Sequence, residues 1–260
     1  MNTLILKGKV VSLKVKDELL LKLIDLGSKG IIPSLAAIII GDNPASKLYV
    51  SSKAKAFSKL SCYSEIFELP SDTKKDNLIN FINELNENKK FHGILLQLPL
   101  PKHLDEKEIL KTISPKKDVD GLHPENQGYI MQGDPKFIPC TPFGCLQILD
   151  YYNIDIEGKD VVVVGRSNLV GKPIASLLSQ NFSYGNATVT LCHTRTKDLE
   201  SYTKKADIII AAVGVPNLIK KNMIKEGAHI IDVGINRVDD TLAKKGYRIV
   251  GDVDLDSMID

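Results

Sequence analysis

Short apolar runs alternate with stretches of helical periodicity along the first part of the chain. Residues 35–40 and 93–97 form continuous apolar runs, and residues 63–69 alternate apolar with polar side chains, as strands do. Apolar residues at helical spacing predict helices over 9–26, 44–60, 73–86 and 104–112. Asp42 or Asn43 is the expected N-cap of the helix that Pro44 opens. Strands that alternate with helices predict a parallel sheet with helices on both faces.

A second pattern of the same kind follows a loop-rich stretch. Residues 114–142 are rich in glycine and proline, which marks a domain boundary, and we place it between residues 121 and 122. A helix over 142–152 leads into strands predicted at 160–164, 187–192, 208–212, 229–233 and 248–250, with helices between them. The predicted fold class is therefore α/β, with two doubly wound domains at 1–121 and 122–260.

A glycine-containing loop directly follows the valine strand at 161–164. Its sequence is Gly165-Arg-Ser-Asn-Leu-Val-Gly171, and Pro173 suits the first turn of a helix. A strand, a glycine loop and a helix start together point backbone N–H groups at an anion, with the helix dipole behind them. The spacing departs from G-x-G-x-x-G, so the alternative is a tight turn without a ligand. We favour dinucleotide binding because the loop follows so strong a strand.

The end of the next strand indicates which dinucleotide binds. NAD-binding units carry an acidic residue about 20 residues beyond the glycines, on the ribose 2′-hydroxyl. Here the strand ends in Leu191-Cys-His-Thr-Arg-Thr196, without a carboxylate. Thr194 and Arg195, together with Arg166 in the loop, suit a 2′-phosphate instead. The alternative is that both arginines are ordinary solvated charges, but the pattern favours NADP over NAD.

The first domain carries three polar side chains on one helix face. Ser46, Tyr49 and Lys53 are three and four residues apart, near the carboxyl edge of strand 35–40, where ligands collect in open α/β sheets. A lysine beside a tyrosine, partly removed from water, can transfer protons near neutral pH. The alternative is a solvated helix face. Y-x-x-x-K also occurs in short-chain dehydrogenases, but there the tyrosine follows the dinucleotide loop, whereas Tyr49 precedes Gly165.

Two further motifs bear on the chemistry. Gln97 lies at the end of a strand and is followed by Leu98 and Pro99; it is either a substrate ligand or a polar cap. Asp118 and Asp120 lie on a loop before the boundary. Paired acids usually belong to a turn, yet a carboxylate can also accept two N–H donors from a heterocycle.

Composition excludes several classes of function. The 260-residue chain has 43% hydrophobic and 25% charged residues and a net charge of +2, which gives no argument for nucleic acid or an acidic membrane surface. The N-terminus lacks the pattern of a signal peptide, and no apolar stretch is long enough to span a bilayer. Cysteines and histidines show no metal-ligand spacing. We therefore expect a cytoplasmic protein without a structural metal.

Together these motifs identify a family that the chain resembles, the bifunctional methylenetetrahydrofolate dehydrogenase/methenyltetrahydrofolate cyclohydrolases. The resemblance rests on six motifs in the family's order: Tyr49-Val-Ser-Ser-Lys53, Gly93-Ile-Leu-Leu-Gln-Leu-Pro-Leu-Pro101, Lys117-Asp-Val-Asp-Gly121, Pro139-Cys-Thr-Pro142, Gly165-Arg-Ser-Asn-Leu-Val-Gly171 and Asp232-Val-Gly-Ile-Asn236. It implies an N-terminal catalytic, folate-binding domain and a C-terminal Rossmann-type NADP domain that flank a cleft. It also implies a homodimer that acts on tetrahydrofolate derivatives in one-carbon metabolism and purine biosynthesis.

The resemblance also assigns roles to residues. Lys53 would be the key catalytic group, with Tyr49 stacking on the substrate, Gln97 orienting the lysine and Asp120 holding the pterin-like ring. The remaining substrate contacts would come from Ser46, Leu98 and Pro99. The NADP site would comprise Gly165, Arg166, Ser167, Gly171, Thr194, Arg195, Gly234 and Ile235. Lys53 would supply the proton transfer that opens the methenyl ring to 10-formyltetrahydrofolate.

The sequence departs from the family after the strand that ends at Gly251-Asp-Val253. Relatives continue into a segment rich in proline and glycine and a final helix, whereas this sequence stops at Asp260. The sequence therefore omits the tail of a normal enzyme, or the protein is a truncated, weakly active or non-catalytic folate- or nucleotide-binding remnant. The coding frame beyond Asp260 discriminates the two. Another two-domain NADP dehydrogenase is a further alternative, but it would have no use for Gln97 and Asp120.

Overall fold

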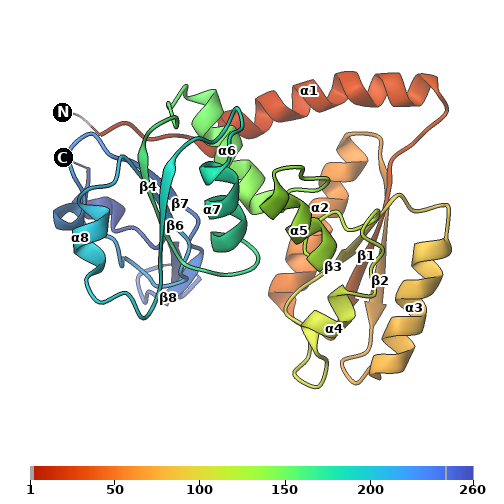
Figure 1. Ribbon diagram of the computed structural model, residues 1–260. Helices are drawn as coiled ribbons and strands as arrows, with labels where there is room; N and C mark the ends of the chain where they lie inside the picture. The colour runs from red at the N-terminus through yellow and green to blue at the C-terminus, as the bar shows by residue number, and fades with distance from the viewer. Residues whose placement is uncertain (1–2, 244, 260) are drawn as a thin grey trace. The chain divides into compact units, whose positions relative to one another are not determined.

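The computed structural model describes residues 3–243 and 245–259, and the chain forms two compact α/β units (Figure 1). The N-terminal unit comprises residues 9–128, and the C-terminal unit joins the residues up to Gly8 to those from Tyr129 onward. The functional division that the sequence predicts between residues 121 and 122 stays a prediction.

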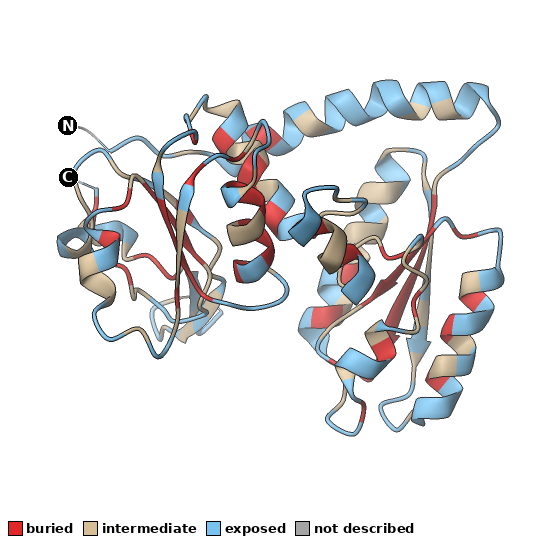
Figure 2. Ribbon diagram, in the orientation of Figure 1, coloured by how far each residue is buried: buried red, intermediate tan, exposed pale blue. Residues whose placement is uncertain are grey.

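The N-terminal unit is built on a three-stranded parallel sheet in the order β2-β1-β3. β1 (Ser34–Ile40) lies between β2 (Tyr63–Leu69) and β3 (Gly93–Leu96), and every residue of β1 and β3 is buried (Figure 2). A central strand covered on both faces needs no polar alternation, which explains its continuous apolar sequence.

Helices cover both faces of this sheet. Leu35 and Ile39 cluster with Val50 of α2 (Pro44–Lys59). The alternate residues of β1, including Ile38, cluster with α3 (Lys75–Glu87) and α4 (Glu106–Leu110). The doubly wound arrangement predicted from the sequence is therefore present.

The C-terminal unit repeats this plan with four parallel strands in the order β5-β4-β6-β7. The strands are β4 (Asp160–Val164), β5 (Thr188–Cys192), β6 (Ile208–Ala211) and β7 (His229–Asp232). Val161 and Val163 cluster with residues of α6 (Cys140–Tyr151) and α7 (Gly171–Ser179). Val162 and Val164 face the opposite cluster, which Leu199 of α8 (Leu199–Thr203) joins. The four valines are thus shared between two cores.

Three features differ from the sequence predictions. A helix, α5 (Pro124–Gln132), lies in the stretch expected to be a loop. The strand predicted at 248–250 does not join the parallel sheet: β9 (Tyr247–Val250) pairs antiparallel with β8 (Asn236–Asp239), which the sequence analysis missed. In place of the helices expected after β6 and after β7, the described residues form a short 3-10 turn, η1 (Lys221–Met223), and the strand β8; a second 3-10 turn, η2 (Leu255–Ser257), follows β9. Pairing partners and 3-10 turns depend on tertiary contacts that a local pattern does not contain.

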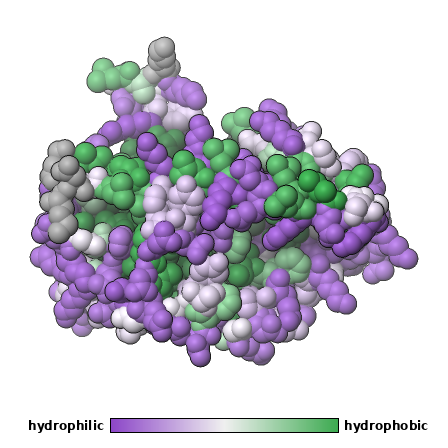
Figure 3. Space-filling model, turned by 90° about the horizontal axis from the view of Figure 1, so that it is seen from above, coloured by the Kyte–Doolittle hydropathy of each residue, from purple (hydrophilic) through white to green (hydrophobic). Residues whose placement is uncertain are grey.

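The first helix, α1 (Gly8–Ser28), has a largely exposed surface. Its only buried residue is Val11, while Leu13, Leu21 and Ile24 are exposed. Figure 3 shows such apolar side chains as green patches among hydrophilic ones on the face drawn there. Within residues 3–243 and 245–259, no helix has both the length and the apolar character needed to traverse a bilayer.

Candidate functional site

The start of α2 is fixed directly beyond the carboxyl end of β1. Gly41 turns the chain with φ at +83°, and the Asn43 side chain accepts hydrogen bonds from the N–H groups of Ala45 (3.0 Å) and Ser46 (3.2 Å). Asn43 is therefore the N-cap, one of the two residues expected, and Pro44 occupies the first helical turn. This arrangement places buried Ser46 at the carboxyl edge of the sheet.

Lys53 lies between an aromatic ring and a carboxylate. Its Nζ is 4.5 Å from the centroid of the Tyr49 ring and 3.9 Å from Oδ1 of Asp120. The lysine and aspartate side chains are 27% and 24% exposed, so the pair is partly withdrawn from water. A cation over a ring face and near a carboxylate is held by two attractions at once. The structure thus brings together three of the residues that the sequence singled out.

Asp118 and Asp120 have different surroundings, although they are two residues apart. Asp118 is 2% exposed, and its Oδ2 accepts hydrogen bonds from His123 N and Asn126 Nδ2, both at 2.8 Å. Its segment also lies along β3, because Ile94 N donates to Lys117 O at 2.8 Å. Asp118 therefore anchors the strand-like segment that presents Asp120 to Lys53. No feature of the sequence distinguishes this anchoring role, since both aspartates lie in one short motif.

Gln97 continues β3 by one residue and remains close to the sheet. Its N–H donates to Ile38 O at 2.9 Å, and its side-chain Nε2 donates to the carbonyl of Leu98 at 2.6 Å. The Leu98–Pro99 peptide bond is cis. The amide of Gln97 is thus engaged by its own strand end, and its predicted role of orienting Lys53 stays a prediction.

The dinucleotide loop depends on two glycines for its close backbone packing. Gly165 has φ at +120°, and a Cβ there would lie 2.1 Å from Ala212 O. A Cβ on Gly171 would lie 2.0 Å from Gly165 O. Only glycine allows the loop to pass this close to β6 and then to enter α7. Ser167 Oγ accepts hydrogen bonds from Val170 N (3.1 Å) and Gly171 N (3.4 Å), which anchors the first turn of α7.

The end of β5 presents exposed side chains on a fixed turn. His193 N donates to Thr196 Oγ1 (2.9 Å), and Arg195 N donates to the ring nitrogen Nδ1 of His193 (3.1 Å). Thr194, Arg195 and Arg166 are exposed at this edge. No carboxylate occurs between His193 and Thr196, as the 2′-phosphate interpretation requires.

Asp232, the last residue of β7, and Asp252, which follows β9, organise the backbone of the nearby loops. Asp232 Oδ1 accepts hydrogen bonds from Gly234 N (2.9 Å) and Asp252 N (3.0 Å). Asp252 is fully buried, and its carboxylate accepts hydrogen bonds from Val213 N, Gly214 N and Asn236 Nδ2. The neighbouring Ile235 is 82% exposed. Asp232 belongs to a sequence motif, whereas Asp252 was not singled out, because its hydrogen-bond donors lie elsewhere in the chain.

The residues at this edge fit a phosphorylated dinucleotide. The loop packs so tightly that a Cβ at Gly165 or Gly171 would clash, so both positions require glycine. Because glycine has no side chain, the backbone at the start of α7 is uncovered at these positions. Such a helix start favours a pyrophosphate, and two exposed arginines supply cations for a further phosphate.

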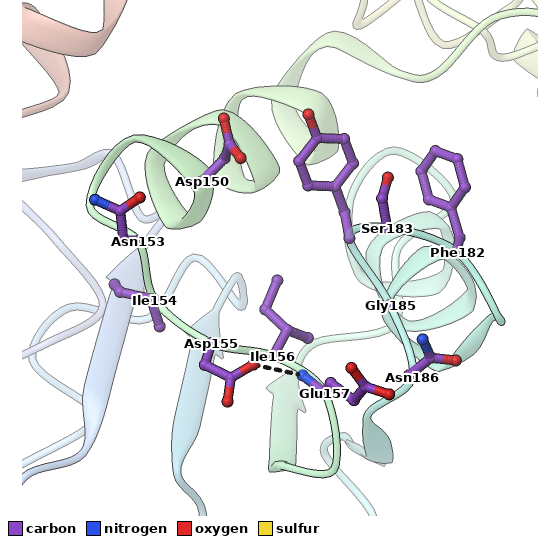
Figure 4. Close-up of a pocket in the computed structure, with 11 residues that line it drawn as sticks. Asp150, Asn153, Ile154, Asp155, Ile156, Glu157, Phe182, Ser183, Gly185 and Asn186 are labelled. Carbon is purple, nitrogen blue, oxygen red and sulfur yellow. Dashed lines mark hydrogen bonds between the residues drawn. The ribbon is translucent and has the colours of Figure 1, made fainter.

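A surface hollow of the C-terminal unit lies elsewhere. Figure 4 shows this hollow of about 310 Å³, formed by residues that precede β4, among them Asp155 and Glu157, and residues that precede β5, among them Phe182 and Asn186. It therefore lies at the amino edge of the sheet, opposite the edge where ligands bind in such folds. We do not assign the cofactor to it.

Three of the four cysteines are at least partly buried. Burial raises the pKa of Cys145 to about 11 and also raises the pKa values of Cys62 and Cys192, so these thiols stay protonated near neutral pH. In the described part of the chain, no group of three or more histidine, cysteine or acidic side chains could hold a metal ion.

Comparisons with known proteins cover almost the entire chain. Residues 6–120 match the catalytic domain, and residues 139–260 the NAD(P)-binding domain, of the tetrahydrofolate dehydrogenase/cyclohydrolase family model. A Chlorobium chlorochromatii protein named bifunctional protein FolD is 50% identical over 254 residues, which are 96% of this chain and 86% of the relative.

Solved structures agree with the sequence comparisons. The Campylobacter jejuni FolD methylenetetrahydrofolate dehydrogenase/cyclohydrolase is 48% identical, with a TM-score of 0.90 over 97% of this chain and 86% of its own. A Trypanosoma brucei enzyme of this name, complexed with NADP cofactor and an inhibitor, is 35% identical, with a TM-score of 0.91 over 99% of this chain and 87% of its own.

Proposed function

The chain belongs to the tetrahydrofolate dehydrogenase/cyclohydrolase family, and we infer that it is a bifunctional NADP-dependent enzyme of one-carbon folate interconversion. It oxidises 5,10-methylenetetrahydrofolate to 5,10-methenyltetrahydrofolate and hydrolyses the methenyl compound to 10-formyltetrahydrofolate. The observation that carries the hydrolytic assignment is the position of Lys53 between Tyr49 and Asp120 in the unit that matches the catalytic domain.

Oxidation of the substrate demands orientation more than acid or base catalysis. NADP, when bound, accepts a hydride from the one-carbon bridge, which leaves a methenyl cation on the folate. We assign Tyr49 to stacking on the substrate, because its ring is exposed, and Asp120 to hydrogen bonding with the N–H groups of the pterin-like ring. Ser46, Gln97, Leu98 and Pro99 complete the proposed folate site.

Hydrolysis requires proton transfer. Water adds to the methenyl carbon and gives up a proton, which leaves a hydroxyl group on this carbon. The bond from the carbon to N5 then breaks as N5 takes up a proton and the hydroxyl gives up its own, so that the formyl group stays on N10. Lys53 is the group we assign to these transfers, because its ammonium is partly withdrawn from water and lies within reach of both Tyr49 and Asp120.

For NADP we propose a site at the carboxyl edge of the C-terminal sheet. Gly165, Ser167 and Gly171 would receive the pyrophosphate at the start of α7, since the glycines leave the backbone uncovered. Arg166, Thr194 and Arg195 would hold the 2′-phosphate, and Gly234 and Ile235 would contact the nicotinamide end. The NADP complex of the Trypanosoma brucei relative supports this choice of cofactor.

Neither alternative from the sequence is favoured. A non-catalytic remnant or another two-domain NADP dehydrogenase would not need Lys53 close to both Tyr49 and Asp120, and both family domains match here. We further propose a cytoplasmic homodimer whose formylated product supplies purine biosynthesis. Sedimentation of the purified protein tests the dimer.

The substitution Lys53→Met tests the hydrolytic assignment, and Lys55→Met, on the same helix and exposed, is its control. We expect the first variant to lose cyclohydrolase activity by about 100-fold or more, as loss of a general acid–base group does. The control should keep its rate. The loss of methenyl absorbance in the absence of NADP measures this step, and NADP binding by calorimetry shows that the other unit is intact.

Near-normal hydrolysis of the methenyl compound by Lys53→Met would show that Lys53 does not supply the proton transfer. A supply of methylenetetrahydrofolate with NADP, and with NAD for comparison, measures the dehydrogenase step separately. No oxidation with either dinucleotide would contradict the proposed function itself.

A further inference from the structure

We propose that Asp252 is a positioning residue that holds the backbone frame of the NADP site and thereby sets the affinity for NADP. The proposal rests on the function inferred above for the identity of the cofactor. Asp252 lies outside the residues assigned to cofactor contact, in the segment that follows β9.

The carboxylate of Asp252 connects two loops that leave the carboxyl edge of the sheet. Its Oδ2 accepts hydrogen bonds from the successive N–H groups of Val213 (2.7 Å) and Gly214 (3.0 Å), directly after β6. Its Oδ1 accepts one from Asn236 Nδ2 (2.8 Å), beyond β7. The carboxylate thus accepts two hydrogen bonds from backbone N–H groups and one from a side-chain amide, and the Asp252 side chain is fully buried.

The loop after β6 in turn determines where the dinucleotide loop can lie. Gly165 packs directly on Ala212, because a Cβ at Gly165 would be 2.1 Å from Ala212 O. Ala212 immediately precedes Val213, which Asp252 holds. A shift of the Val213–Gly214 backbone would therefore displace the surface on which Gly165 rests.

The loop after β7 packs on Asp252 in a comparable way. A Cβ at Gly234 would lie 2.4 Å from both the backbone nitrogen and Oδ1 of Asp252. Gly234 and Ile235 are thus placed by contact with this aspartate as well as by Asp232, which binds Gly234 N and Asp252 N. Loops on both sides of the proposed cofactor site share one buried carboxylate.

A carboxylate suits this position better than any other small side chain. It offers acceptor oxygens only, and the groups around it are donors, so each contact is a charge-assisted hydrogen bond. The isosteric change Asp252→Asn removes the charge and replaces one of the two acceptor oxygens with an NH₂ group, so the charge-assisted hydrogen bonds that join the two loops are weakened. The side-chain volume is almost unchanged, but the distance between the two loops is no longer held fixed.

The experiment compares Asp252→Asn with Asp256→Asn, which removes the same charge from an exposed carboxylate four residues later. Calorimetric titration with NADP gives the dissociation constant, and dehydrogenase kinetics give KM for NADP and kcat. Cyclohydrolase activity without NADP reports on the other unit.

We expect Asp252→Asn to raise both the dissociation constant and KM for NADP by about tenfold, the effect of losing one charge-assisted hydrogen bond. Its kcat at saturating NADP and its cyclohydrolase rate should stay within about twofold, because NADP at saturation restores the loop arrangement. Asp256→Asn should match the unaltered protein. Unchanged NADP affinity in Asp252→Asn overturns the proposal. A fall in kcat at unchanged KM for NADP also overturns it, because that is the result expected if Asp252 only supports folding.

Two further variants keep the test decisive. The exchange Asp252→Asn with Asn236→Asp restores a donor–acceptor pair between the two side chains, so we expect it to recover most of the NADP affinity. Asn236→Ala removes the same hydrogen bond without altering the carboxylate and should raise KM about fivefold. If Asp252→Asn does not fold, Asn236→Ala is measured in its place. An unchanged KM for NADP in Asn236→Ala overturns the proposal. If the unaltered protein binds no NADP, the proposed function fails instead.

Discussion

Replacing Gly165 with alanine adds a single methyl group at the tightest point of the dinucleotide loop. Gly165 has φ at +120°, and the added Cβ would lie 2.1 Å from Ala212 O and 2.8 Å from Ala212 C. Gly144→Ala is the matched control in the same unit, because Gly144 lies within α6 and has no atom within 4 Å of an added Cβ.

The two substitutions should act in opposite directions. A backbone conformation that suits only glycine costs a larger residue about 1–3 kcal/mol. An overpacked contact adds about 1–3 kcal/mol, since carbon atoms ordinarily stay 3.5 Å or more apart. Gly165→Ala should therefore lower the free energy of unfolding by about 2–6 kcal/mol, or a Tm by roughly 6–18 °C. Gly144→Ala should raise stability by about 1 kcal/mol, because alanine is the better helix former.

Thermal unfolding followed by circular dichroism measures both effects, and the transition that shifts upward on addition of NADP identifies the C-terminal unit. NADP titration should show weak or no binding to Gly165→Ala and unaltered binding to Gly144→Ala. A Gly165→Ala protein with a Tm within about 1 °C of the unaltered protein and the same NADP affinity would refute the argument from close packing.

Two further predictions concern buried and paired carboxylates. Asp118→Ala leaves His123 N and one of the two N–H groups of Asn126 Nδ2 without an acceptor, so we expect a loss of about 2–4 kcal/mol in urea unfolding together with lower cyclohydrolase activity; unchanged stability would contradict the anchoring role. The pKa of Asp207 is lowered by its hydrogen bonds from Lys225 and from Asp160 N, so the stability that these contacts provide is present above the ordinary carboxyl range and is lost as the pH falls through the folded pKa. Asp207→Asn should accordingly be less stable than the unaltered protein at pH 7, and the difference should shrink below about pH 4; a difference that is constant with pH would contradict this.

The sequence predicted those parts of the fold that local patterns control. The apolar run at 35–40 and the valines at 161–164 are buried strands at the expected positions, because a strand covered on both faces is recognisable from its composition. The helix α5 was missed because Gly128 interrupts its pattern and because Asp118 stabilises its first turn from a neighbouring segment. Such a helix is encoded by tertiary hydrogen bonds rather than by its own periodicity.

For the candidate site, the sequence indicated which residues take part but not how they are held. The spacing of Tyr49 and Lys53 places both on one helix face, and the structure adds Asp120 at 3.9 Å from the lysine. Asp252 binds a donor 39 residues away in the chain, and Asp118 binds donors at the start of a helix that the sequence did not predict, so no motif could have revealed their roles. The cofactor and substrate roles of individual residues stay predictions.

The two aspartates beyond β7 and β9 each fill the space next to a glycine of the other segment. Gly234 packs on Asp252, and an added Cβ on Gly251 would lie 1.7 Å from Asp232 Oδ2. Each aspartate therefore requires glycine at the facing position, because any larger residue there would clash with its carboxylate. Attempts to exchange the cofactor by protein engineering should leave these four positions fixed. Thr194 and Arg195 are exposed on their turn and offer positions where variation costs the fold little.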